Sequence, residues 1–128
     1  SPTLTERIHR AECLAFLHDQ AGAQLLGCGA LKRPKAEHRA AMFRRAGATV
    51  PPEAFELEIG WLAGEPEIVD ALVAALKARA SGRPVLVLTS TDETALLKVL
   101  AAHGFQPGGP PYPSGRGDYS NQLFLLDA

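Results

Sequence analysis

A strand–helix–strand pattern occupies residues 55–88, which read FELEIGWLAGEPEIVDALVAALKARASGRPVLVL. Residues 55–59 alternate apolar and polar side chains at period two, which predicts a half-buried strand through Leu62. Pro66 stands near the start of the following helix, whose apolar stripe consists of Ile68, Val69, Leu72, Val73 and Leu76. Residues 85–88 form a continuous apolar run, typical of a strand covered on both faces. A helix between two such strands predicts that they lie parallel in one sheet.

Strands that pair antiparallel with this unit are expected earlier in the sequence. Two apolar segments, 13–17 and 24–31, are separated by a turn-like stretch and predict a β-hairpin. A helix should then run from Lys35 to about Ala46, after Pro34 and before Gly47. A further short helix is expected near Thr3 or Thr5.

The remaining elements follow the central unit. Ser90 and Glu93 have the spacing of a capping box, which predicts a helix through Ala102. Residues 107–117 hold four prolines and four glycines and are expected to be an irregular loop. A last strand is expected over 122–126. The whole order predicts one α/β (α+β) domain over residues 1–128, with a mixed sheet and helices on both faces.

Composition narrows the class of protein. The chain has 128 residues and a net charge of −1, which argues against a general nucleic-acid binder. No apolar stretch approaches the ~20 residues of a membrane helix, and no basic region followed by an apolar one opens the chain, so a cytoplasmic location is expected. Cys13 and Cys28 lack metal-ligand spacing and are expected to be half-buried thiols in strands. No metal site is expected.

Four segments carry a resemblance to a known family. They are GCGALKRP at 27–34, EIGWL at 58–62 before a helix, TSTDE at 89–93 leading to HGF at 103–105, and PYPSGRGDY at 111–119. Together they resemble the GNAT N-acetyltransferase superfamily, and the resemblance extends over nearly all of residues 14–126. It implies a GNAT-like mixed sheet, here with the first strand and helices truncated, and transfer of an acetyl group from acetyl-CoA to a small-molecule or protein amine.

The resemblance also implies a site. Glu58 or Glu56, which share one face of the predicted strand, would act as general base, unless this is only a solvated strand face. The acetyl-CoA contacts would come from Ile59, Gly60, Trp61, Leu62 and Gly64. Residues expected to contact the acceptor are Arg33, Tyr112, Arg116 and Tyr119. A small acidic partner could dock on the basic stretch 32–45, but a solvated helix face is the favoured interpretation of such a charge run. For Arg116, an internal contact to Asp118 is an equal alternative.

Departures from the family pattern leave a second hypothesis open. The glycine-rich turn that holds the pyrophosphate of acetyl-CoA is reduced to residues 63–67, where Pro66 lacks an N–H and two glutamates are present. The usual tyrosine of the last helix has no counterpart in 99–102. The chain could therefore be an impaired enzyme or a non-catalytic GNAT-like binding or regulatory module. Because a truncated sheet exposes an edge, a homodimer is expected as a third alternative that is compatible with either.

Overall fold

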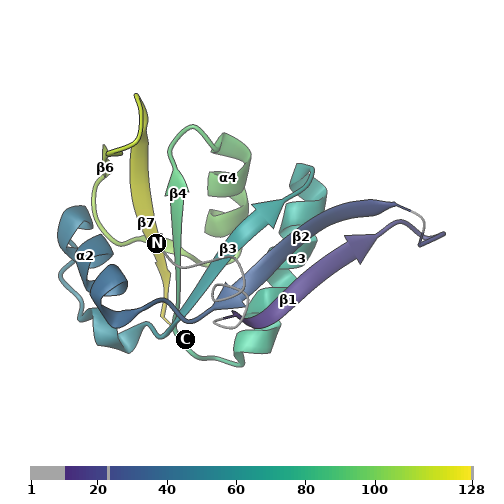
Figure 1. Ribbon diagram of the computed structural model, residues 1–128, viewed down its shortest axis with the longest axis horizontal. Helices are drawn as coiled ribbons and strands as arrows, with labels where there is room; N and C mark the ends of the chain where they lie inside the picture. Colours follow the sequence, from purple (N-terminus) through teal and green to yellow (C-terminus); the bar gives the residue numbers. More distant parts are fainter. Residues whose placement is uncertain (1–10, 23, 128) are drawn as a thin grey trace.

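The computed structural model describes residues 11–22 and 24–127, and its strands form one mixed sheet (Figure 1). The strands are β1 (Ala11–His18), β2 (Leu25–Lys32), β3 (Leu57–Ala63), β4 (Val85–Ser90), β5 (Gln106–Pro107), β6 (Tyr112–Pro113) and β7 (Ser120–Leu126). Their order is β1-β2-β3-β4-β7-β5, with β6 also paired to β7. The pair β3 and β4 is parallel and the other pairs are antiparallel, which confirms the predicted mixed sheet.

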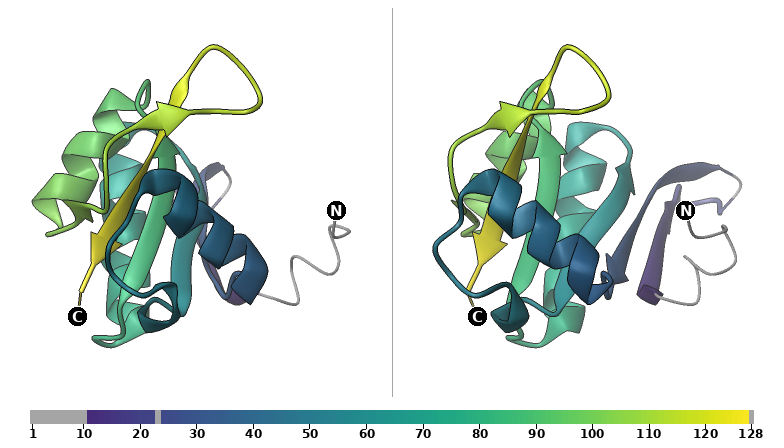
Figure 2. Two further views of the ribbon diagram at one scale, coloured as in Figure 1. Left: turned by 90° about the vertical axis from the view of Figure 1, so that its left-hand side faces the viewer. Right: turned by 60° about the vertical axis from the view of Figure 1, so that its left-hand side comes forward.

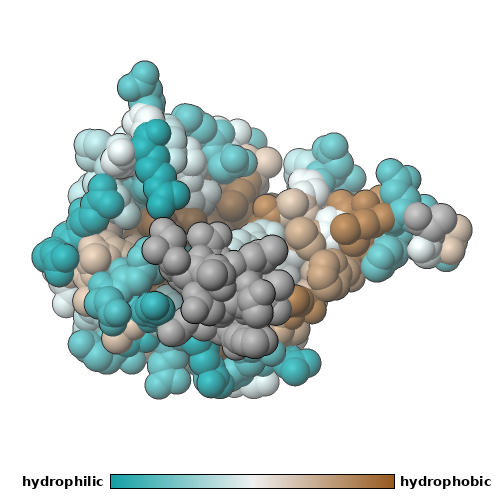
Figure 3. Space-filling view, viewed as in Figure 1, coloured by the Kyte–Doolittle hydropathy of each residue, from teal (hydrophilic) through white to brown (hydrophobic). Residues whose placement is uncertain are grey.

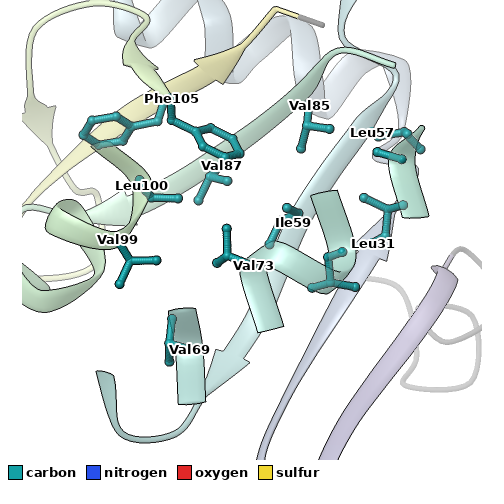
Figure 4. Close-up of a cluster of buried hydrophobic side chains, with 13 residues drawn as sticks. Leu31, Leu57, Ile59, Val69, Val73, Val85, Val87, Val99, Leu100 and Phe105 are labelled. Atoms are coloured by element: carbon teal, nitrogen blue, oxygen red, sulfur yellow. The ribbon is translucent and has the colours of Figure 1, made fainter. Parts of the chain in front are cut away.

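Helices cover both faces of this sheet (Figure 2). They are α2 (Ala36–Ala46), α3 (Pro66–Ala80) and α4 (Thr94–Ala102), with a short 3-10 turn at Pro52–Ala54. On one face, α3 and α4 enclose the larger core, in which Ile59, Val73 and Val87 pack together (Figure 4). On the other face, Phe43 of α2 packs with Phe55 over Leu86 and Leu123. In the described part of the chain, α2 is therefore the one α-helix that covers this second face of the sheet.

The helix boundaries follow local signals in the sequence. Helix α2 ends at Gly47, whose φ of 68° is in the left-handed region that glycine adopts without strain. Helix α3 begins at Pro66, which lacks the N–H that would be unpaired there, and it ends at Ser81. The predicted hairpin, the helix before Gly47 and the strand–helix–strand unit are therefore confirmed. The short helix expected near Thr3 lies outside the described residues.

Two predictions in the second half were wrong. Ser90 does not cap α4, because it is the last residue of β4 and its Oγ accepts a hydrogen bond from the Asp92 N–H at 3.1 Å. Helix α4 starts later, after Glu93, and no side chain caps it. The segment 107–117 is also not wholly irregular, since β5 and β6 take parts of it into the sheet through pairing with β7.

The sheet opens between its two parallel strands. Strands β3 and β4 are paired only at Leu57 with Val85 and at Glu58 with Leu86, although both strands continue beyond these pairs. Figure 1 shows the two strands diverging from this point in a V. The backbone of β3 after Glu58 therefore no longer has β4 as a hydrogen-bonding partner.

A β-bulge lies in the diverging part of β3. Ala30 of β2 faces Gly60 and Cys28 faces Ala63, so β3 has one more residue than β2 between the two pairs. Trp61 within the bulge has a φ of 54°, which is rare for a residue with a bulky side chain. The Cys28 thiol donates to the Trp61 carbonyl oxygen over 3.6 Å. The bulge is thus located at the opening of the sheet.

The edge strand β1 is attached by an ion-pair cluster. The Glu12 carboxylate accepts hydrogen bonds from Arg83 and Arg33, each with one nitrogen at 2.6 Å. These hydrogen bonds, first from Arg83 and then from Arg33, lower the pKa of Glu12 from 4.5 to about 2. The cluster therefore connects β1 to the ends of β2 and α3.

We expect E12Q to lower the free energy of unfolding at pH 7 by about 1 kcal/mol, because it removes a charge from two partly exposed ion pairs. The folded-state pKa of Glu12 is lowered, so its stabilisation is present above the unfolded value of 4.5 and is lost as the pH falls toward 2. Urea denaturation of E12Q and of E53Q, an exposed glutamate in the 52–54 turn, across this pH range tests this. Equal behaviour of the two variants would contradict it.

Strand β1 also presents apolar side chains to solvent. Leu14 is 41% exposed and Phe16 is 58% exposed. Figure 3 shows hydrophobic residues gathered over the β1–β2 hairpin, away from the hydrophilic surface of α2. At the end of the strand order, β1 has β2 as its only strand partner among the residues described. The expected open edge is present, and pairing of two copies through it stays a prediction.

Candidate active-site cleft

A cleft of about 830 Å³ lies on the α2 side of the sheet, where β3 and β4 separate. Its walls come from the end of β2, from α2, from β3 and from the loop between β6 and β7. The lining residues are Lys32, Arg33, Pro34, Lys35, His38, Ala41, Met42, Arg45, Glu58, Trp61, Leu88, Tyr112, Ser114, Gly115, Arg116, Tyr119 and Asn121. The cleft is thus formed jointly by the diverging strands and by the Pro/Gly-rich loop.

Glu58 provides the one carboxylate among these lining residues. It is 9% exposed, and its Oε1 lies 3.8 Å from the Lys32 Nζ. Burial raises the pKa of Glu58 above its usual value, and the charges of Lys32 and His38 only partly oppose this shift. A carboxylate with a raised pKa is a better proton acceptor near neutral pH than a solvated one.

Lys32 and Trp61 form the neighbouring wall. The Lys32 Nζ lies 4.7 Å from the centroid of the Trp61 ring, within the range of a cation–π interaction. A Cβ added at Gly60 would lie 2.9 Å from this lysine side chain. Glycine at position 60 therefore gives Lys32 room to reach both the ring and the Glu58 carboxylate.

The opposite wall joins α2 to the loop between β6 and β7. The Arg45 guanidinium lies 5.2 Å from the centroid of the Tyr112 ring, and its Nη2 donates to the Pro113 carbonyl oxygen at 3.4 Å. Burial raises the pKa of Tyr112, which keeps the hydroxyl protonated. The chain passes close to α2 at Gly109, where an added Cβ would lie 2.1 Å from the Ala46 carbonyl oxygen. This close approach fixes the segment between β5 and β6, which leads to Tyr112, against the helix.

The cleft is strongly basic although the whole chain has a net charge of −1. Five of its lining residues are lysine or arginine: Lys32, Arg33, Lys35, Arg45 and Arg116. Lys32 is paired with Glu58, and Arg33 with Glu12. The other three form no salt bridge with any residue of 11–22 or 24–127, and the alternative contact between Arg116 and Asp118 is absent there.

Some of the residues predicted for the site lie together. Those that line the cleft are Glu58, Trp61, Arg33, Tyr112, Arg116 and Tyr119. Glu56 does not line it, because it precedes the first residue of β3 and is exposed. Ile59 and Leu62 pack on the α3 side of the sheet, and Gly64 lies in the turn before α3. The structure therefore separates the two candidate carboxylates.

Sequence reasoning considered the basic stretch 32–45 as a whole but did not choose which residues of α2 and its N-cap line the cleft. Lys35, His38, Met42 and Arg45 line the cleft, whereas Arg44 does not. These positions recur at intervals of three or four, which places them on one side of a helix. The helical period was therefore the available signal for choosing among the basic residues of this segment. Asn121 of β7 had no such signal, since only the fold brings it to the cleft.

The start of α3 offers little to a phosphate group. Pro66 has no N–H, and the N–H groups of Ile68 and Val69 both donate to the Glu65 carbonyl oxygen at 2.9 Å. The carboxylate of Glu67 lies in the first turn, where it opposes binding of an anion. This helix N-terminus is therefore a poor binding site for a pyrophosphate. The part of β3 that is not paired with β4 is better suited to a ligand that carries amide groups.

The described part of the chain has neither a metal-binding cluster nor a membrane-spanning helix. No group of three or more His, Cys, Asp or Glu side chains that could hold a metal ion occurs in residues 11–22 and 24–127. In the same residues, no helix is both long enough and apolar enough to cross a membrane. Cys13 and Cys28 are free thiols of intermediate exposure in β1 and β2, as the sequence predicts.

Comparison with known proteins identifies the fold. No protein-family model and no curated protein matches the chain. TofI, solved in a ternary complex with an inhibitor and MTA, matches with a TM-score of 0.64 and 17% identity, covering 89% of this chain and 62% of TofI. NAA60 of Arabidopsis thaliana, solved with acetyl-CoA, matches with a TM-score of 0.58 and 15% identity, covering 84% of this chain and 68% of NAA60. These matches show that the chain has the GNAT fold.

Proposed function

We propose that this protein transfers an acetyl group from acetyl-CoA to an amine, with Glu58 as the general base. The observation that carries this proposal is the position of a largely buried carboxylate at the opening between β3 and β4, inside a cleft of about 830 Å³. The GNAT fold supports it, because NAA60 has the same fold and was solved with acetyl-CoA. The site residues, not the fold alone, are what the proposal depends on.

Glu58 would act on the acceptor. An amine must lose its proton before its nitrogen can attack a carbonyl carbon, and a buried carboxylate of raised pKa can accept that proton directly or through water. Lys32, 3.8 Å away, supplies a positive charge that partly opposes the rise in the pKa of Glu58 and so favours its ionised form. Acetyl-CoA, when bound, supplies the acetyl group as a thioester.

The backbone of β3 would hold the donor. After Glu58, the strand has no strand partner on its β4 side within residues 11–22 and 24–127, so β4 does not take up the N–H and C=O groups on that side. The pantetheine arm carries two amides and can bind there as an additional strand would. Ile59, Gly60, Trp61 and Leu62 are the residues that would offer these backbone groups, and the exposed α3 N-terminus would contribute little to the phosphates.

We therefore expect acetyl-CoA to bind no more than about tenfold more tightly than S-acetylpantetheine, which lacks the nucleotide and its phosphates. Calorimetric titration with both compounds, and with CoA as a comparison, measures the difference. A loss of more than about 100-fold without the nucleotide would show that other residues hold the phosphates and would contradict this assignment. Absence of binding by both compounds at millimolar concentration would overturn the proposed function.

A second candidate function is a GNAT-like module that binds a ligand without transferring an acetyl group. It is favoured by the same α3 N-terminus, where Pro66 and Glu67 replace the amide-rich phosphate site that the resemblance implies. The two candidates make opposite predictions in the titration above. Binding of either thioester favours the transferase, and binding of neither leaves the module.

A further inference from the structure

We propose that the acceptor is a small amine that also carries a carboxylate or a phosphate, and that this anionic group binds between Arg45 and Arg116. The description of the ligand as an acceptor rests on the proposed function. The anion site itself depends only on the arrangement of charges in the cleft. The shared chemistry is a compact anion, and the experiment below distinguishes its two sources.

The charges in the cleft are divided between two regions. Glu58 is on β3, and among the described residues its salt-bridge partner is Lys32. Arg45 on α2 and Arg116 in the loop between β6 and β7 line the same cleft without a salt bridge to any residue that the structure describes. A ligand with an amine at one end and an anion at the other would match both regions.

Arg45 is positioned before any ligand arrives. Its guanidinium is held by the Tyr112 ring at 5.2 Å and by the Pro113 carbonyl oxygen at 3.4 Å. Neither partner is negatively charged, so the positive charge is oriented but not neutralised. A guanidinium in a fixed orientation binds carboxylate or phosphate oxygens through two parallel hydrogen bonds with a smaller loss of side-chain entropy.

The size of the cleft favours a small molecule. Its volume of about 830 Å³ lies within the range of ~300–1,000 Å³ typical of small-molecule sites. Aromatic side chains of Trp61, Tyr112 and Tyr119 supply apolar contact area beside the charges. A peptide would need a binding surface that extends beyond this cleft. Tighter binding of an acidic peptide is therefore the competing outcome of the test.

Trp61 allows a direct measurement of binding. It is the one tryptophan of the chain and lines the cleft, so its fluorescence reports on ligands there. We would titrate the protein with inorganic phosphate and with succinate at constant ionic strength, without acetyl-CoA. The variants are R45Q and R116Q. The matched control is R44Q, which removes an exposed arginine next to Arg45 that does not line the cleft.

At least one of the two ions should produce a saturable change in Trp61 fluorescence. The ion that binds more tightly shows whether the anionic group of the ligand is a phosphate or a carboxylate. R45Q and R116Q should each weaken this binding by about tenfold, with R44Q within about twofold of the unmodified protein. No saturable change with either ion, equal weakening by R44Q, or tighter binding of an acidic hexapeptide than of both ions would overturn the proposal.

The two proposals fail separately. Thioester binding in the calorimeter with no anion binding in the fluorescence titration would overturn the anionic acceptor and leave the transferase in place. Anion binding without thioester binding would overturn the transferase and leave the anion site in place. R116Q should leave the fold intact, so weaker binding by this variant would not result from unfolding. Arg116 is exposed, and its side chain makes no hydrogen bond or ion pair within the described segments.

Discussion

Replacing Glu58 with glutamine is expected to lower the rate of acetyl transfer at least about 100-fold, because it removes the proton acceptor and keeps the shape of the side chain. The measurement is the release of free CoA thiol from acetyl-CoA at saturating amine. E56Q is the matched control, since Glu56 is exposed and lies outside the cleft. A rate for E58Q within about twofold of the unmodified protein would remove Glu58 from the mechanism.

Stability distinguishes this loss from misfolding. Burial raises the folded-state pKa of Glu58, so its contribution to stability is fully present below the unfolded value of 4.5 and is lost as the pH rises through the raised value. As the pH rises, the protein therefore has to bury a charge that E58Q does not carry. We expect the stability of E58Q relative to the unmodified protein to be higher at pH 8 than at pH 5. A stability difference that is unchanged or reversed between these pH values would contradict this account.

Replacing Gly109 with alanine is expected to lower the free energy of unfolding by about 2 kcal/mol. The new Cβ would lie 2.1 Å from the carbonyl oxygen of Ala46, and neither atom can rotate away, because the backbone fixes the position of a Cβ and the oxygen belongs to the backbone of α2. The Gln122 amide also donates to the Gly109 carbonyl oxygen at 3.2 Å, which holds this segment from the other side. The segment between β5 and β6 should therefore separate from α2, and Tyr112 should move away from Arg45.

G115A is the matched control for this substitution. It lies in the same proline- and glycine-rich segment, but the nearest atom to its added Cβ is the Arg45 Nη2 at 3.9 Å. Its effect on stability should stay within about 0.5 kcal/mol. Urea denaturation gives both values, and phosphate titration followed by Trp61 fluorescence should show weaker binding for G109A than for the unmodified protein. Equal stability of the two variants would contradict the contact between the loop and α2.

The sheet and helices could be predicted from the sequence because their signals are local. The alternation at Leu57 and Ile59, Pro66 at the start of a helix and Gly47 at the end of another each act within a few residues. The wrong assignment at Ser90 has the same origin. A Ser followed by Glu after three residues has the capping spacing, but pairing with Asn121 of β7 keeps Ser90 in its strand. A long-range strand pair thus outweighed a local motif.

The candidate site was predictable only in part, for a different reason. Period two places Glu56 and Glu58 on one face of any strand that contains both, so the sequence could not choose between them. The structure separates them because β3 starts at Leu57. The contact of Arg45 with Pro113 joins residues 68 positions apart, and no local pattern reports such a pair. The resemblance to GNAT proteins indicated the loop, whereas the fold places it against α2.

The bulge in β3 sets a rule for the length of this segment. Side chains in a regular strand alternate between faces, so Glu58 and Trp61, an odd number of positions apart, would point to opposite sides of the sheet. Both line the cleft because the bulge at Trp61 adds one residue to β3 relative to β2. Deleting a single residue between them would leave them two positions apart, and a regular strand without the bulge would again place both on the cleft side. The stretch can therefore lose the bulge and one residue together, whereas a one-residue deletion that keeps the bulge would turn either the acid or the indole into the core beneath α3, which constrains how this stretch can evolve.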